Sequence, residues 1–175
     1  MSESEQLSRR ETWQLLARDT RNMARAVLTR DPMGRYYRHV QRLPEGHIMP
    51  YQAMLLRRFA NTQPIKTIAE IGFNGGHSAY NFLLSRPDVQ VTSYELEMAK
   101  HVARAKQRID ADFPNRHTLI IGDSKETIPM AAAKGLVYGL VFIDGDHSFE
   151  GARTDLANCR GIAAADTILV MDDID

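Results

Sequence analysis

Five short apolar segments from residue 65 onward constrain the fold of this chain more strongly than any other feature. Most of them are apolar almost without interruption, as strands buried on both faces of a parallel sheet are. They span residues 65–71, 89–95, 118–121, 140–144 and 167–171. Amphipathic segments alternate with them, at residues 76–85, 98–113, 124–134 and 148–160. This order predicts an α/β fold, a Rossmann-like doubly wound parallel sheet with right-handed crossovers.

The first sixty residues have a different pattern, which predicts helices. Apolar side chains spaced three and four residues apart indicate one helix over residues 4–29. Pro50 is expected to begin a second helix. We therefore expect a helical cap over residues 1–60 and the sheet domain over residues 61–175.

Composition excludes several classes of function. The chain has 175 residues, enough for one domain, and its 22 basic and 22 acidic residues balance. A net charge of zero argues against binding nucleic acid or a membrane surface through bulk charge. No stretch without Asp, Glu, Lys or Arg reaches the ~20 residues of a membrane span. Because the single Cys159 cannot form an internal disulfide, we expect a cytoplasmic protein.

The segment after the first predicted strand is rich in glycine, from Gly72 to Gly76. Glycine lets the backbone turn tightly and approach a ligand, and the next helix begins with free N–H groups. The spacing is not G-x-G-x-x-G, because Phe73 and Asn74 interrupt it. Glu70 precedes the turn, where its carboxylate could face a cationic or amino-bearing ligand. The alternative is a turn that merely needs small residues.

Polar residues also follow the second and third predicted strands. Glu95 lies 19 residues after Gly76, where an acid can accept hydrogen bonds from ribose hydroxyls. A plain surface charge is the alternative. Gly122, Asp123 and Ser124 follow the third strand. Asp123 or Ser124 can cap the next helix, and the same groups could reach an adenine edge.

Carboxylates follow the fourth and fifth predicted strands, at Asp144 and at Asp172 with Asp173. Carboxylates brought together at neighbouring strand ends repel each other, so we expect a cation between them. Oxygen ligands suit Mg²⁺, Mn²⁺ or Ca²⁺ better than zinc, whereas His147 would suit a softer metal. The alternative is that Asp146 caps the following helix and that His147 only packs.

Taken together, these strand ends resemble those of class I S-adenosylmethionine (SAM)-dependent methyltransferases. The resemblance covers residues 48–175 and is carried by the glycine turn, Glu95, residues 122–124 and residues 144–151. Its most specific part is the sequence FIDGDHS. The branch that the chain looks most like is that of the metal-dependent O-methyltransferases related to catechol O-methyltransferase.

The resemblance implies SAM as the cofactor and a role for each part of the site. Glu70 would meet the ammonium group of the cofactor, directly or through water, and Glu95 would hold both ribose hydroxyls. The methionine carboxylate and the turn would be lined by four residues of the glycine motif: Gly72, Asn74, Gly76 and Ser78. The adenine would lie beside the residues that follow the third strand: Gly122, Asp123 and Ser124.

The same resemblance implies the metal ligands and the base. Asp144, Asp172 and Asp173 match the metal positions of that branch, with Mg²⁺ as the expected ion. Asp144 is assigned to cofactor binding and catalysis as well. The family commonly carries asparagine at the last of these positions, so Asp173 adds a negative charge. Catechol enzymes have a lysine base at the position of His147, which makes His147 the expected base here.

The expected function is therefore SAM-dependent methyl transfer to a hydroxyl of a small molecule, either catechol-like or a sugar diol, with a divalent ion assisting. One alternative is a non-catalytic cofactor-binding or interaction domain. A second alternative is an NAD-dependent oxidoreductase, which shares the glycine turn and Glu95 but does not explain the strand-end aspartates.

The family sheet has two further strands after the fifth, and residues 1–175 contain no segment for them. We therefore expect a domain that is incomplete at its C-terminus. Its fifth strand would form a sheet edge, and a second copy of the chain could cover that edge in a homo-oligomer.

Overall fold

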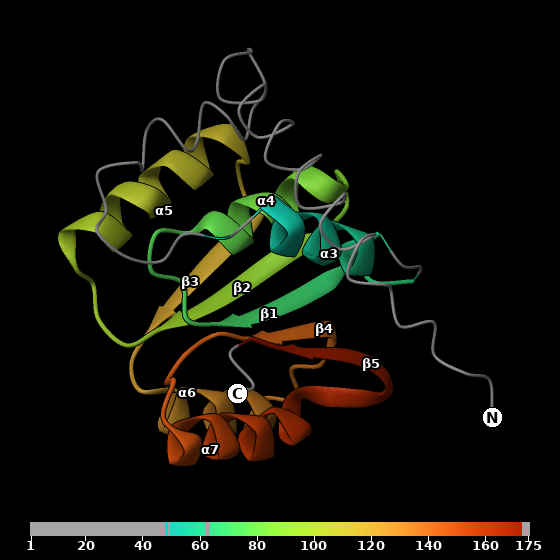
Figure 1. Cartoon of the computed structure of the whole chain (residues 1–175), viewed down its shortest axis with the longest axis vertical. Coiled ribbons are helices and arrows are strands. Elements are labelled where there is room, and N and C mark those ends of the chain that lie inside the picture. The colour runs from blue at the N-terminus through green and yellow to red at the C-terminus, as the bar shows by residue number, and fades with distance from the viewer. Residues whose placement is uncertain (1–47, 49, 62–63, 173–175) are drawn as a thin grey trace, which may run out of the picture.

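A five-stranded parallel sheet forms the centre of the computed structural model, which describes residues 48, 50–61 and 64–172 (Figure 1). The strand order is β3-β2-β1-β4-β5. The strands are β1 (Thr67–Ile71), β2 (Gln90–Glu95), β3 (His117–Ile121), β4 (Tyr138–Ile143) and β5 (Ala163–Met171). Their order reverses between β1 and β4, as in a doubly wound sheet. The predicted fold class is confirmed.

Helices cover both faces of this sheet. On one face lie α3 (Pro50–Ala60), α4 (His77–Ser85) and α5 (Lys100–Asp112). On the other lie α6 (Ser124–Ala133) and α7 (Phe149–Cys159), followed by the short η1 (Arg160–Ile162) (Figure 1). The predicted helix over residues 4–29 lies outside the described residues.

Each face of the sheet has its own apolar core. The core under α4 and α5 includes the fully buried Phe82, Leu83 and Ile109. The core under α6 and α7 includes Ile128 and Cys159. Because both faces are covered, β1 and β4 bury apolar residues on both sides, such as Ile68 and Ala69 of β1 and Leu140 and Val141 of β4, and this makes the sequence pattern clear.

Helix α3 shares the first of these cores, although it belongs to the predicted cap over residues 1–60. Its Leu56 and Ala60 are buried there. The Asn81 side chain on α4 donates to the carbonyl of Ala53 at 2.7 Å and accepts a hydrogen bond from Arg57. Helix α3 is therefore fastened to the sheet domain by both apolar and polar contacts.

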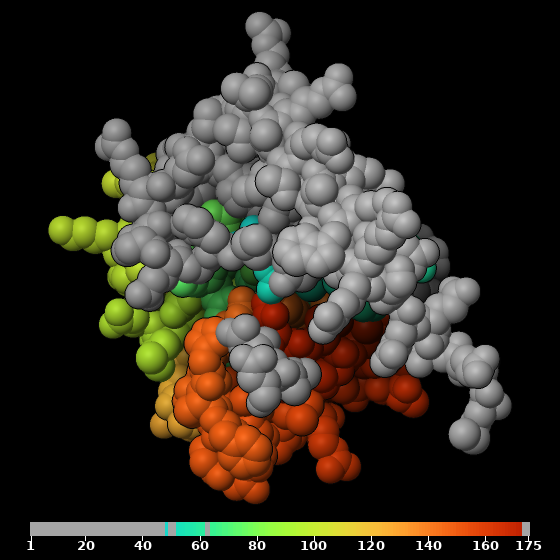
Figure 2. All heavy atoms as spheres, in the orientation of Figure 1, coloured from blue at the N-terminus to red at the C-terminus, as the bar shows by residue number. Residues whose placement is uncertain are grey.

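Strand β5 lies at an edge of the sheet, as predicted, and begins four residues before the predicted start. A register shift against β4 pairs Tyr138 with Ala163 but Leu140 with Ile168. Thr167 stabilises the irregular part, since its hydroxyl donates to the Tyr138 carbonyl at 2.7 Å. In the space-filling view, the segments from β4 to β5 form the orange and red part of the face shown (Figure 2). That a second copy of the chain covers the edge of β5 stays a prediction.

Within the described residues, no helix is both long enough and apolar enough to cross a membrane.

Candidate functional site

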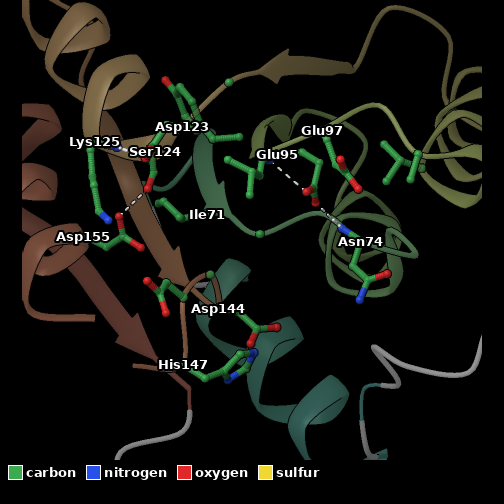
Figure 3. A pocket seen from close by; sticks show the side chains of 18 of the residues that line it. Ile71, Asn74, Glu95, Glu97, Asp123, Ser124, Lys125, Asp144, His147 and Asp155 are labelled. Carbon is green, nitrogen blue, oxygen red and sulfur yellow. Dashed lines mark hydrogen bonds between the residues drawn. The ribbon is translucent and has the colours of Figure 1, made fainter. Parts of the chain in front are cut away.

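The carboxyl ends of the parallel strands surround a cavity of about 540 Å³, a volume typical of sites for small molecules and cofactors. Its wall includes eight of the residues predicted for the site: Gly72, Asn74, Glu95, Gly122, Asp123, Ser124, Asp144 and His147. Glu70, Gly76, Ser78 and Asp172 are not part of this wall. Figure 3 shows the side chains that point into the cavity from these strand ends.

The glycine turn is shaped by its contact with the end of β4. Gly72 has a φ of +89°, and a Cβ atom there would lie 1.9 Å from the Asp144 carbonyl oxygen. Asp144 in turn donates its N–H to the Ile71 carbonyl at 2.8 Å. Gly76, with a φ of +66°, precedes α4. Only glycine at position 72 allows the two strand ends to approach this closely.

Glu95 binds the backbone of the glycine turn directly. Its Oε2 accepts the N–H groups of Phe73 at 3.0 Å and Asn74 at 2.7 Å, and its Oε1 accepts the N–H of Leu96 at 2.8 Å (Figure 3). A carboxylate has about four acceptor sites, so Glu95 keeps capacity for a ligand hydroxyl. Glu95, which is predicted to bind the ribose hydroxyls, thus also fixes the shape of the turn.

Glu70 lies beneath the turn instead of on the cavity wall. It is fully buried, and its carboxyl group accepts hydrogen bonds from the hydroxyls of Ser78 and Ser93. Ser93 continues the network to His117 Nε2 at 2.9 Å, and the His117 ring stacks on Phe73. Burial raises the pKa of Glu70 to about 8 and lowers the pKa of His117 to about 4. Glu70 is therefore mostly neutral at pH 7, and its predicted contact with an ammonium group stays a prediction.

At the end of β3, the two residues that could cap α6 have different roles. Asp123 is the cap, since its carboxylate accepts the Lys125 N–H at 2.9 Å. The Ser124 hydroxyl instead donates to Asp155 on α7 at 2.6 Å. Both side chains also line the cavity, so the capping role of Asp123 does not exclude the predicted contact of these residues with the cofactor's adenine.

The ends of β4 and β5 bring two of the predicted metal ligands together. The register pairs Ile143 with Met171, so Asp144 and Asp172 follow on neighbouring strands, and Asp172 donates its N–H to the Ile143 carbonyl. The Asp172 carboxylate accepts a hydrogen bond from Gln52 of α3 at 2.9 Å.

The oxygen donors of Asp144 and Asp172 suit a hard ion such as Mg²⁺. Asp173 lies outside the described residues. Among the residues that the structure does describe, no group of three or more acids, histidines or cysteines could hold a metal ion.

His147 lies in the loop between β4 and α7, on the same side of the cavity as Asp144 (Figure 3). Asp146 does not cap α7 itself. Its carboxylate accepts the N–H of Ser148, and Ser148 is the cap, accepting from Gly151 at 3.0 Å. The hydrogen bond from Ser148 holds the pKa of Asp146 below its usual range. The chain reversal after β4 is therefore fixed by local hydrogen bonds.

Several residues of the cavity wall were not predicted from the sequence. His101, near the start of α5, is one of them. Another is Asp155, which is buried on α7. A signal for Asp155 exists in the sequence, because Gly151, Asp155 and Cys159 recur every four residues and form the buried stripe of that helix.

The cavity is strongly acidic. Among the described residues, its wall includes a single lysine, Lys125, and six acids: Glu95, Glu97, Asp123, Asp144, Asp146 and Asp155. Opposite charge attracts most strongly where water is partly excluded. The site is thus suited to a ligand with positive charge.

A doubly wound sheet with a large cavity at its carboxyl ends defines a class of cofactor-binding α/β proteins. A family model described as "Methyltransferase domain" matches residues 69–174, and the chain belongs to this family. No curated protein matches the chain.

Several solved structures share the fold. An O-methyltransferase from Bacillus cereus, solved in complex with SAH (S-adenosylhomocysteine), is 19% identical over 89% of this chain and 74% of its own, with a TM-score of 0.72. The O-methyltransferase of Streptomyces achromogenes involved in tomaymycin synthesis, in complex with SAM, is 18% identical over 94% and 74%, with a TM-score of 0.73. The SAH-bound Podospora anserina methyltransferase is 18% identical over 98% and 73%, with a TM-score of 0.74.

Proposed function

We propose that this chain transfers the methyl group of SAM to a hydroxyl oxygen of a small molecule, catechol-like or a sugar diol. The observation that carries this proposal is the acidic cavity beside a glycine turn that Glu95 holds in shape. Membership of the methyltransferase-domain family supports the reaction class. The SAM- and SAH-bound structures with the same fold support the cofactor.

The charge of the cavity favours SAM in particular. SAM carries a sulfonium and an ammonium group against one carboxylate, so it has a net positive charge. Six acids and one lysine line the described wall. NAD carries a pyrophosphate, and the same acids would repel it. This is the main physical reason to prefer a methyltransferase over the NAD-dependent alternative.

The acceptor would lie at the ends of β4 and β5. A divalent ion, if bound there, would be held by Asp144, Asp172 and Asp173, and it would orient the acceptor and make its hydroxyl more acidic. Gln52, which hydrogen-bonds Asp172, connects this end of the sheet to α3. An acceptor that enters beside α3 would therefore contact both this helix and the ends of β4 and β5.

In the transfer itself, an acceptor oxygen attacks the methyl carbon while the carbon–sulfur bond breaks, and SAH leaves with the electron pair. The acceptor's proton goes to a base, for which His147 is the candidate because it lies on the cavity wall with Asp144 and a neutral imidazole has a nitrogen that can accept a proton. The remaining work of the site is orientation, which can contribute several kcal/mol, up to ~7–11 in ideal cases.

The test is methyl transfer from labelled SAM to a panel of catechols and sugar diols, with Mg²⁺ and with EDTA. We expect transfer to at least one diol, a loss of about a hundredfold in EDTA and in Asp144→Asn, and a similar loss in His147→Ala. Transfer that survives both EDTA and Asp144→Asn would contradict the metal-assisted part. Transfer unaffected by His147→Ala would remove the proposed base.

A further inference from the structure

Phe73 attaches the glycine turn to the core of the domain, away from the cavity. Its neighbours Gly72 and Asn74 line the cavity wall, whereas Phe73 is not part of this wall and is 2% exposed. The Phe73 side chain belongs to the apolar core under α4 and α5. The turn therefore presents its backbone to the cavity and buries one side chain on the opposite side.

The conformation of the turn needs support from its surroundings. Gly72 and Asn74 have positive φ angles of +89° and +42°. Asparagine tolerates such a backbone better than most residues, but the conformation persists only where neighbouring groups determine it. On the cavity side, Glu95 accepts the N–H groups of Phe73 and Asn74. On the core side, the Phe73 side chain fixes the turn.

The Phe73 ring packs on a buried histidine. The His117 ring stacks on it with the ring centroids 5.1 Å apart and an angle of 23° between the ring planes. His117 is the first residue of β3 and is 7% exposed. Its Nε2 lies 2.9 Å from Ser93 Oγ on β2, and this hydrogen bond fixes the orientation of the ring. The platform under Phe73 is therefore built on two paired strands.

The imidazole makes this contact as an uncharged aromatic ring. Burial and the charge of Lys106 lower the pKa of His117, while the charge of Asp110 raises it less, so the ring is neutral at pH 7. Within the described residues, the buried Nδ1 has no hydrogen-bond partner. A phenylalanine in place of His117 would thus keep the stacked ring and lose only the hydrogen bond to Ser93.

We propose that His117 is a positioning residue for cofactor binding: its ring anchors Phe73 and thereby holds the glycine turn in the shape that receives the cofactor. The inference rests on the proposed function, because it takes SAM as the ligand of the turn. His117 acts through Phe73 and not by touching the ligand, since neither residue is part of the cavity wall. A turn that is ordered before the ligand arrives removes the cost of ordering from binding, so loss of the anchor weakens binding.

The experiment is calorimetric titration of the full chain with SAH, combined with amide hydrogen exchange. In His117→Gln, the side-chain amide can still donate to Ser93, but the ring is lost. We expect this variant to bind SAH about tenfold more weakly, and residues 72–76 to exchange faster while β4 and β5 keep their rates. His117→Phe restores a ring and should bind SAH within about threefold of wild type. Thr118→Ala, at the exposed next position of β3, is the matched control and should equal wild type in both measurements.

Wild-type affinity in a folded His117→Gln would overturn the inference. Faster exchange throughout the sheet would also overturn it, because that pattern indicates a general loss of stability. If His117→Phe bound SAH as weakly as His117→Gln, the ring would not be the anchor.

A second variant covers the case in which His117→Gln does not fold. Phe73→Leu removes the other ring of the stacked pair and should weaken SAH binding by a similar factor, and a folded Phe73→Leu with wild-type affinity would contradict the anchor. If wild type bound no SAH, the proposed function would fail and the inference with it. SAH binding that is the same in wild type and the folded variants would contradict the inference alone.

Discussion

Gly72 shows how one residue sets the geometry of the whole site. Its φ of +89° is unfavourable for other residues, and a Cβ atom would collide with the Asp144 carbonyl oxygen. Gly72→Ala should therefore lower the free energy of unfolding by about 3 kcal/mol or more, measured by urea denaturation. Gly135 is the matched control: its φ is +72°, but a Cβ there would meet nothing within 4 Å. Gly135→Ala should cost only about 1 kcal/mol. Equal losses of stability in Gly72→Ala and Gly135→Ala would contradict the close approach of Gly72 to the Asp144 carbonyl.

Glu70 predicts a dependence of stability on pH. Its pKa is about 8 in the folded chain, because of burial, against 4.5 ordinarily. Between these values the unfolded chain releases a proton that the folded chain keeps, so the contribution of Glu70 to stability falls as pH rises. Glu70→Gln removes this titration.

The free energy of unfolding of Glu70→Gln, relative to wild type, should accordingly rise from pH 4.5 to pH 8, by on the order of 3 kcal/mol. Urea denaturation at several pH values measures the difference. If the stability curves of wild type and Glu70→Gln stayed parallel between these pH values, the pKa of Glu70 would not be raised in the folded chain.

At this scale, local motifs predicted which residues lie at the cavity. Gly72, Asn74, Glu95, Asp123 and Asp144 all line its wall, and the binding roles assigned to them stay predictions. The hydrogen bond of Asp155 was missed because it joins α7 to the first residue of α6, 31 residues away in the sequence. The burial of Glu70 was missed because a charged residue beside a glycine turn gives no sign of the serines that enclose it.

At the scale of elements, Arg116 joins the turn after α4 to the strands beside it. It donates to the backbone carbonyls of Leu83, Arg86 and Val89, and its guanidinium lies over the Phe113 ring at 5.5 Å. Arg116→Ala would leave these carbonyls without their donor.

We expect Arg116→Ala to lower the free energy of unfolding by about 2 kcal/mol, and Arg116→Lys to recover less than half of it, since lysine lacks the planar donor fork. Arg153, in an exposed pair with Glu150 at 2.9 Å, is the control, and Arg153→Ala should change stability by less than about 0.5 kcal/mol. Urea denaturation of the three variants decides the matter. Similar losses in Arg116→Ala and Arg153→Ala would refute this role.

The boundaries of the elements show where sequence patterns suffice. The predicted segments at 76–85 and 124–134 differ from α4 and α6 by a single residue at one end, because Gly76 and Asp123 mark the helix starts. The start of β5 was missed because residues 163–166 are three alanines and an aspartate, of which residues 164–166 are exposed. Only their pairing with Tyr138 across the sheet makes them a strand, and pairing partners are not visible in a local pattern.

At the scale of the molecule, the doubly wound sheet gathers distant segments into one acidic cavity. Residues from the ends of four strands and from α5, α6 and α7 form its described wall, with one lysine beside six acids. The fold class followed from the order of the apolar segments alone. The ends of the strands identified the methyltransferase family because chemistry in such sheets is concentrated there. Under the proposed function, the acceptor would contact a surface that includes α3, for which the sequence has no comparable pattern.

The central claim is that this cavity binds a cationic adenosyl cofactor. Calorimetric titration of the same chain with SAM and with NAD tests it most directly. We predict that SAM binds at one site, that binding weakens with added salt because the attraction is between charges, and that NAD gives no binding heat at the same concentrations. Binding of NAD without binding of SAM would contradict the account.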